Sequence, residues 1–211
     1  MHQKIIFVNG HLFSGTYPGG AGYWLGADSP FVANAHSVLQ CELPAHFTDI
    51  KHAALSSVFS RMKAGWQYAQ KNEASLLSGF ESASYRFNFV THSMGAAFAE
   101  GIIRFLEDKE YRVCTVIHFN TFQAADIKIE RKAGSKSYVI DYQNINDPLI
   151  NNPVYAKPGD IRNADLSIRQ KSNKPFFKRH RDPIDSEHSW FVIRNFLAES
   201  NNAIVGTTVH L

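Results

Sequence analysis

The sequence has little cysteine, no long apolar run and no excess of charge of one sign. Cys41 and Cys114 are its only cysteines among 211 residues, too few to indicate a disulfide framework. No stretch reaches the roughly 18 apolar residues of a membrane span, and the apolar run that follows Lys4 is too short for a signal peptide. The net charge of +3 gives no reason to expect a nucleic acid partner. We therefore expect a cytoplasmic protein by default, with secretion by another route left open.

Histidine is abundant, but its spacing does not indicate a metal site. The ten histidines form no H-E-x-x-H motif and no Cys/His ligand pattern. We expect neither a metal nor a cofactor.

The order of apolar patterns along the chain predicts the fold class. With 44% hydrophobic residues, the chain is long enough to bury one substantial core, so residues 1–211 are expected to form a single domain. Strand-like runs occupy residues 5–8, 85–90, 113–119 and 137–142, and helical spacing occupies 48–77, with Thr48 as its possible N-cap, and 189–197. Strands that alternate with helices predict an α/β fold with a mainly parallel sheet and helices on both faces.

A glycine- and aromatic-rich segment at residues 14–30 interrupts this pattern. It contains Tyr17, Tyr23 and Trp24 among glycines and prolines, which disfavour regular structure. Irregular segments of this length are usually functional, so we expect a lid or substrate loop in which these three aromatic residues contact the substrate. The alternative is a loop packed passively over the core.

The stretch at residues 89–97, FVTHSMGAA, has the spacing of the G-x-S-x-G motif with Thr91 in the first glycine position. A nucleophile elbow needs a strand that turns sharply into a helix, which exposes the serine at the turn. The sequence therefore predicts Ser93 as a nucleophile, and the alternative is a serine that only caps a helix. The neighbouring His92 is expected to line the substrate site.

This elbow resembles that of lipases, and the resemblance continues downstream through residues 85–197. In class 3 (fungal-type) lipases a strand leads into T-F-G-x-P-R, where this chain has NTFQA at 120–124; a later segment reads N-x-x-D-x-V, where it has NIND at 144–147; and a late histidine precedes an aromatic residue, as in EHSW at 187–190. The resemblance implies an α/β-hydrolase fold and a serine acyl-hydrolase of lipase or esterase type. A thioesterase or amidase with the same triad and a non-catalytic, hydrolase-like binding module remain alternatives.

In this fold the acid follows the nucleophile along the chain, and the histidine follows the acid. Asp147 comes just after the strand at 137–142, at the sheet edge where ligands bind in open α/β sheets. Asp126 and Asp141 compete with it, although Asp141 is expected to point into a face of the sheet. A role for Asp147 as a turn residue before Pro148 is the alternative.

Three histidines follow Asp147, namely His180, His188 and His210. His188 directly precedes the last helical pattern, so we predict it to be the base. His180 lies in the basic run KRHR, which is typical of a solvated surface, and His210 lies at the chain terminus.

The oxyanion hole is expected to use two backbone N–H groups. One belongs to Met94, which follows the nucleophile. The other comes from the loop after the first strand, where His11 is favoured and Leu12 is its rival, because Gly10 permits close backbone approach.

Residues 169–181 contain many Lys and Arg and no acid, with Phe176 and Phe177 in the middle. A solvated loop explains this composition. The functional alternative is peripheral contact with an anionic membrane surface, with both phenylalanines entering the interface.

Overall fold

The computed structural model describes residues 2–11, 19–50, 56–81, 84–135, 137–154, 156, 158–199 and 206–211, except the side chains of Phe177 and Glu199. Its strands are β1 (Lys4–Val8), β2 (His46–Thr48), β3 (Arg86–His92), β4 (Arg112–Phe119), β5 (Tyr138–Asn144), β6 (Leu166–Gln170) and β7 (Thr207–His210). The α-helices are α1 (Gly19–Tyr23), α2 (Pro30–Leu39), α3 (Val58–Lys71), α4 (Glu73–Leu77), α5 (Gly95–Asp108), α6 (Asp182–Asp185) and α7 (His188–Glu199). Two short 3₁₀ turns, η1 (Ala124–Asp126) and η2 (Phe176–Lys178), complete the described elements.

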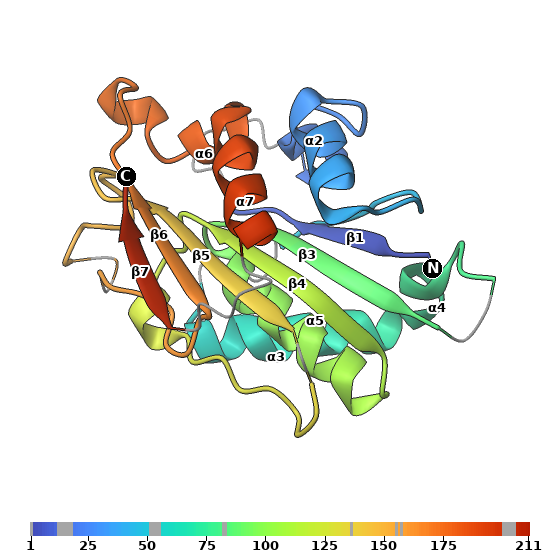
Figure 1. Ribbon diagram of the computed structural model, residues 1–211. Helices are drawn as coiled ribbons and strands as arrows, with labels where there is room; N and C mark the ends of the chain where they lie inside the picture. The colour runs from blue at the N-terminus through green and yellow to red at the C-terminus, as the bar shows by residue number, and fades with distance from the viewer. Residues whose placement is uncertain are drawn as a thin grey trace.

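The seven strands form one parallel sheet in the order β2-β1-β3-β4-β5-β6-β7 (Figure 1). Its strands carry continuous apolar runs because helices cover both faces, as β1 shows with five buried residues in succession. The chain thus has the α/β architecture, with a parallel sheet, that the alternating sequence pattern predicts.

Helices α2 and α7 cover one face of the sheet, and α3 and α5 cover the other (Figure 1). Alternate strand residues divide accordingly between two cores. Phe87 and Phe89 of β3 pack with α3 and α5, whereas Val90 packs on the side of α2 and α7. Residues at the carboxyl ends of the strands are therefore presented between two packed layers.

Two glycines let α3 and α5 approach backbone to backbone. A Cβ atom added to Gly65 would lie 1.9 Å from the carbonyl oxygen of Phe98, and one added to Gly101 would lie 1.8 Å from that of Met62. Since real Cβ atoms do not come this close, only glycine fits at either position. The contact fixes α5, the helix that follows Ser93, against α3.

The predicted helix at residues 48–77 is shorter in the structure. Thr48 ends β2 and is not a helix cap. The N-cap is Ser57, whose Oγ accepts a hydrogen bond from the N–H of Ser60 at 3.2 Å, and the helical pattern is divided into α3 and α4 at Asn72. The residues between, 51–55, lie outside the described part of the chain.

Besides the short helices α1 and α6, three strands and one longer helix are absent from the sequence prediction. These are the short β2, the strands β6 and β7, and α2, which begins with Pro30 at its first position after the N-cap Ser29. Among the described residues no helix has the length and apolar character needed to cross a membrane.

Candidate active site

Ser93 occupies a strained turn between β3 and α5. Its φ of +55° lies in the left-handed region, which a residue with a side chain rarely adopts. The turn is held because the N–H of Ser93 donates to the carbonyl of Phe119 on β4 at 2.9 Å. The predicted strand–turn–helix at the elbow is therefore present, and the side chain of Ser93 stands at the carboxyl end of the central strand β3.

The loop after β1 lies directly against this turn. A Cβ atom on Gly10 would lie 2.8 Å from Cβ of Ser93, and a Cβ atom on Gly95 would lie 2.4 Å from the carbonyl oxygen of Asn9. Both close approaches require glycine. They place His11, the residue after Gly10, next to the elbow, while Leu12 lies outside the described residues.

Met94 provides the other expected oxyanion donor. It precedes the first residue of α5, and its backbone N–H makes no hydrogen bond to any residue that the structure describes. The N-terminus of a helix carries a partial positive charge, which favours an anion near such an N–H group.

The carboxylate of Asp147 pairs with the imidazole of His180. Oδ2 of Asp147 lies 2.6 Å from Nδ1 of His180, and Oδ1 accepts the N–H of Leu149 at 2.8 Å. Asp147 is fully buried. Through these two contacts it is both the turn residue before Pro148 and the partner of a histidine. Because the carboxylate can only accept, Nδ1 of His180 carries a proton, which in the neutral imidazole leaves the lone pair on Nε2.

The prediction that Asp147 orients His188 is therefore wrong. His188 is the exposed first residue of α7, and its ring stacks on that of Phe191, with ring centroids 6.4 Å apart. The loop after β6 folds back over the sheet edge and reaches Asp147 at His180, and α6 then carries the chain away before α7 begins (Figure 1).

The competing acids and the terminal histidine are placed elsewhere. Asp141 lies within β5 and forms a buried ion pair with Arg169 at 2.8 Å, as expected for a residue that points into a face of the sheet. Asp126 ends the η1 turn, and His210 is an exposed residue of the edge strand β7.

Two asparagines that the sequence analysis did not single out hold the loop of His180 in place. Nδ2 of Asn120 donates to the carbonyl of His180 at 2.8 Å, and Oδ1 of the same side chain accepts the N–H of Asn144 at 2.7 Å. Asn144 in turn donates to the carbonyl of Arg179 at 3.0 Å. Each asparagine stands at the carboxyl end of a strand, β4 or β5, which is the signal by which they could have been found.

His92, the residue before Ser93, is buried and hydrogen-bonded to the backbone of His180, so it does not line a substrate site. Its side chain is fully buried, and Nε2 lies 2.8 Å from the carbonyl of His180. That carbonyl only accepts, so Nε2 is protonated and Nδ1 accepts the hydroxyl hydrogen of Tyr23. Burial, followed by the nearby His180, lowers the pKa of His92 well below its usual value and keeps the ring neutral.

Tyr23 connects this link to the loop after β1. Its hydroxyl contacts His92 and also accepts a hydrogen bond from the backbone of Gly10. Arg181 covers the ring at 4.8 Å and donates to the carbonyl of Tyr23 at 2.9 Å. Burial, chiefly, raises the pKa of Tyr23, so the hydroxyl remains protonated.

Trp24 also differs from its predicted role as a substrate contact. It is 1% exposed and packs between Phe7 and Phe31, with ring centroids 5.1 and 5.5 Å away. The described part of the glycine-rich segment therefore contributes to the core on the side of α2 and α7. Tyr17 lies outside the described residues.

The rings of His92 and His180 lie beside each other, with centroids 4.6 Å apart. His180 is thus next to the residue that precedes Ser93. No hydrogen bond joins Oγ of Ser93 to Nε2 of His180 within the described structure. Hydrogen bonds between a nucleophile and its base are often long in the absence of substrate and shorten when it binds.

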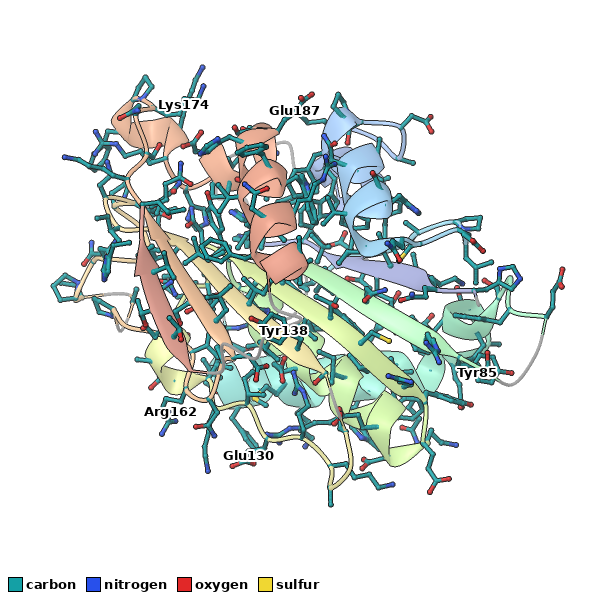
Figure 2. All side chains as sticks on the ribbon, viewed as in Figure 1. Tyr85, Glu130, Tyr138, Arg162, Lys174 and Glu187 are labelled. Atoms are coloured by element: carbon teal, nitrogen blue, oxygen red, sulfur yellow. The ribbon has the colours of Figure 1, made fainter. Side chains whose placement is uncertain are left out.

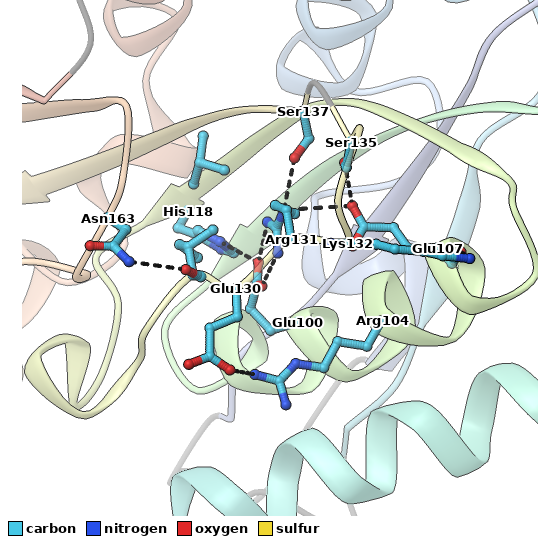
Figure 3. A network of polar contacts seen from close by, with 12 residues as sticks. Glu100, Arg104, Glu107, His118, Glu130, Arg131, Lys132, Ser135, Ser137 and Asn163 are labelled. Carbon is cyan, nitrogen blue, oxygen red and sulfur yellow. Dashed lines mark hydrogen bonds and ion pairs between the residues drawn. The ribbon is translucent and has the colours of Figure 1, made fainter.

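A second histidine–carboxylate pair lies under the sheet, on the side of α5 (Figure 3). Nε2 of His118 is 3.2 Å from Oε1 of Glu100, and Nδ1 is 2.7 Å from Oγ1 of Thr91. Arg131 donates to both carboxylate oxygens of Glu100, at 2.6 and 3.0 Å. Burial alone would raise the pKa of Glu100, but Arg131 and His118 lower it to about 2.

No protein-family model matches this chain, and no curated protein matches it in sequence. Among solved structures, the chain is similar to that of the type II thioesterase BorB from the borrelidin biosynthetic cluster. The two share 12% sequence identity over 94% of this chain and 90% of the other, with a TM-score of 0.46. At this level the likeness concerns the arrangement of strands and helices alone.

Proposed function

We propose that this protein is a serine acyl-hydrolase in which Ser93 is the nucleophile, His180 the general base and Asp147 the residue that orients the base. One observation carries the proposal: Ser93, held at positive φ at the elbow, directly follows His92, whose ring lies beside that of His180, and Nδ1 of His180 is paired with the buried carboxylate of Asp147. The order Ser93, Asp147, His180 is also the chain order typical of α/β-hydrolases.

In the proposed reaction Oγ of Ser93 attacks the acyl carbon while Nε2 of His180 takes its proton. The carboxylate of Asp147 stabilises the imidazolium that forms. His180 then gives the proton to the leaving group, which departs and leaves an acyl-serine. A water molecule then attacks this ester while Nε2 takes its proton. His180 returns that proton to Oγ of Ser93, so the carboxylic acid product leaves and free Ser93 is regenerated.

The developing oxyanion would be stabilised by the N–H of Met94 and by an N–H of the loop after β1, for which His11 is our candidate. The support is the contact of Gly10 with Ser93 and the position of Met94 at the start of α5. Donors fixed before the reaction cost no reorganisation when charge develops.

His92 and Asn120 would act as positioning residues, because both donate to the carbonyl of His180 itself. A base whose backbone is held from two strands keeps its ring beside the nucleophile. Positioning of this kind can be worth orders of magnitude in rate, since small displacements of a catalytic group are costly.

A carboxylic ester is the proposed substrate class, as in lipases and esterases. An activated serine with an oxyanion hole acts at an acyl carbon, and this chemistry also extends to thioesters. Parallel series of p-nitrophenyl esters and of thioesters, matched in acyl chain length, therefore decide the class, with kcat/KM as the measured quantity.

Labelling with a fluorophosphonate tests the proposal, because the reagent modifies an activated serine. We expect covalent modification of Ser93 that is absent in Ser93→Ala and strongly slowed in His180→Ala. His188→Ala is the matched control and should label at the wild-type rate. No labelling of the folded wild type would instead indicate a binding module that keeps the fold without the chemistry.

A further inference from the structure

Two loops form the edge of the sheet beside the proposed base. Residues 145–154 follow β5 and contain Asp147, and residues 171–181 follow β6 and contain His180. Asn146 ties them together, since its Nδ2 donates to the carbonyl of Ser172 at 2.8 Å and its Oδ1 accepts the N–H of Ser172 at 2.9 Å. The outer surfaces of the two loops therefore belong to one continuous edge of the site.

Apolar side chains are exposed on both loops. Ile145, Leu149 and Phe176 are each at least 40% exposed to solvent. Arg179 connects them, because its guanidinium lies 6.0 Å from the ring centroid of Phe176 and donates to the carbonyl of Asn146 at 3.4 Å.

The same edge carries unneutralised positive charge. Lys171, Lys174 and Lys178 are exposed, and none of them forms an ion pair with a residue in the described ranges. Lys174 lies on the segment that projects past the end of the sheet, at the outer margin of the molecule (Figure 2). The only acid in the two loops is Asp147, which is buried against His180.

Fewer basic side chains of residues 169–181 are available at the surface than the sequence predicts. Arg169 belongs to β6 and is buried in ion pairs with Asp141 and Asp160, and Arg181 pairs with Asp185 at 3.0 Å. The three lysines remain as the exposed cations. The side chain of Phe177 is not among those that the structure describes.

We propose that this rim, made of Lys171, Lys174, Lys178, Ile145, Leu149 and Phe176, docks the protein on an anionic lipid surface. Lysine ammonium groups are attracted to acidic headgroups, and apolar side chains between them enter the interface. A nucleic acid would use the lysines but would leave the two aliphatic residues in water. The position of the rim beside Asp147 and His180 has meaning for catalysis only if the proposed function holds, whereas the docking can be tested without turnover.

The test uses Ser93→Ala protein, which leaves the lipid intact, and vesicles of equal parts phosphatidylglycerol and phosphatidylcholine. We expect flotation with these vesicles but not with phosphatidylcholine alone, and weaker binding at high salt. In Lys171→Gln/Lys174→Gln/Lys178→Gln the affinity should fall on the order of 100-fold. The matched control Lys63→Gln/Lys71→Gln/Lys109→Gln removes the same charge from the side of α3 and α5 and should bind as before.

Phe176→Ala separates apolar insertion from simple charge attraction. It should weaken vesicle binding several-fold while leaving the thermal midpoint unchanged, because its side chain is exposed. An equal loss of vesicle affinity in the two triple lysine variants would contradict the proposal. The proposal would also be contradicted if polyuridylate RNA bound as tightly as the vesicles and Phe176→Ala had no effect on that binding. The same rim substitutions made in protein that keeps Ser93, followed by fluorophosphonate labelling, report separately on the proposed function.

Discussion

The two histidine–carboxylate pairs contain nearly the same groups in different settings. Asp147 and His180 lie at the carboxyl edge of the sheet, with the ring of His180 beside that of His92, the residue before Ser93, whereas Glu100 and His118 lie beneath the sheet, with the hydroxyl of Thr91. Both nitrogens of His118 are engaged and its side chain is fully buried. His180 uses only Nδ1 in the described structure and keeps some exposure.

The backbone of the two hydroxyl residues differs as well. Thr91 lies within β3, paired in register with His118, while Ser93 has left the strand and adopts a positive φ. A hydroxyl, an imidazole and a carboxylate are thus insufficient to make a site. The pair of Asp147 and His180 differs in two ways: His180 uses only one of its ring nitrogens within the described structure, and the hydroxyl residue Ser93 lies outside the strand.

The largest expected effect comes from removing each hydroxyl in turn. Ser93→Ala should lower ester turnover by about 10⁶-fold, because only binding and oxyanion contributions remain. Thr91→Val should keep turnover within a few-fold and cost about 1–3 kcal/mol of unfolding free energy through the lost buried hydrogen bond. Turnover with p-nitrophenyl butyrate and urea unfolding measure the two quantities. The opposite pattern would make Thr91 the functional hydroxyl.

Neutralising each carboxylate should separate rate from stability. Asp147→Asn is expected to reduce kcat by about 10⁴-fold, since the amide no longer holds the required tautomer of His180. Glu100→Gln leaves the buried guanidinium of Arg131 without its main partner and should cost about 3–5 kcal/mol of unfolding free energy. Steady-state kinetics and chemical unfolding of both variants measure the loss of rate and the loss of stability separately. A catalytic loss confined to Glu100→Gln would transfer the acid's role to the buried pair.

These placements show what the sequence could and could not predict. The strand–turn–helix at Ser93 was predicted because the local pattern determines it, and chain order selected Asp147, which the structure pairs with a histidine. His180 was missed because it lies in a basic run next to residues such as the exposed Lys178, and sequence does not show that one side chain in such a run turns inward against Asp147.

Trp24 was misassigned for a related reason. Large aromatic side chains suit a core and a substrate pocket equally well, and only the packing on Phe7 and Phe31 decides between them. Thr48 and Ser57 are both acceptable helix caps by residue type, and pairing of residues 46–48 with β1 makes the choice.

The buried imidazole of His92 makes stability depend on pH. Its pKa is lowered in the folded protein, so the unfolded chain takes up a proton near pH 6.5 that the folded chain refuses. The free energy of unfolding therefore has its full value above pH 6.5. At lower pH it decreases, and His92 contributes at most about 1.4 kcal/mol of this decrease per pH unit. Urea unfolding at pH 7.5 and 5.5 should show a smaller difference in His92→Gln than in wild type. His46, whose pKa burial lowers to about 4, contributes equally to both proteins.

The smallest effect is expected for Tyr23→Phe. It removes one hydroxyl that links His92 to Gly10, at a cost of about 1 kcal/mol in stability or transition-state binding. If His92 positions the base, kcat should fall several-fold with KM unchanged. The far-downfield proton resonance of the His180–Asp147 hydrogen bond should also shift, and an unaltered resonance would limit Tyr23 to a packing role.

The contact between α3 and α5 has a consequence for engineering of this protein. With Gly65 and Gly101 each facing a carbonyl of the other helix, even the methyl group of alanine would force the two backbones apart. The displaced helix would be the one whose first turn follows Ser93. Libraries intended to alter substrate preference should therefore leave these two distant glycines fixed, because changes there would move the reaction centre without touching any residue that lines it.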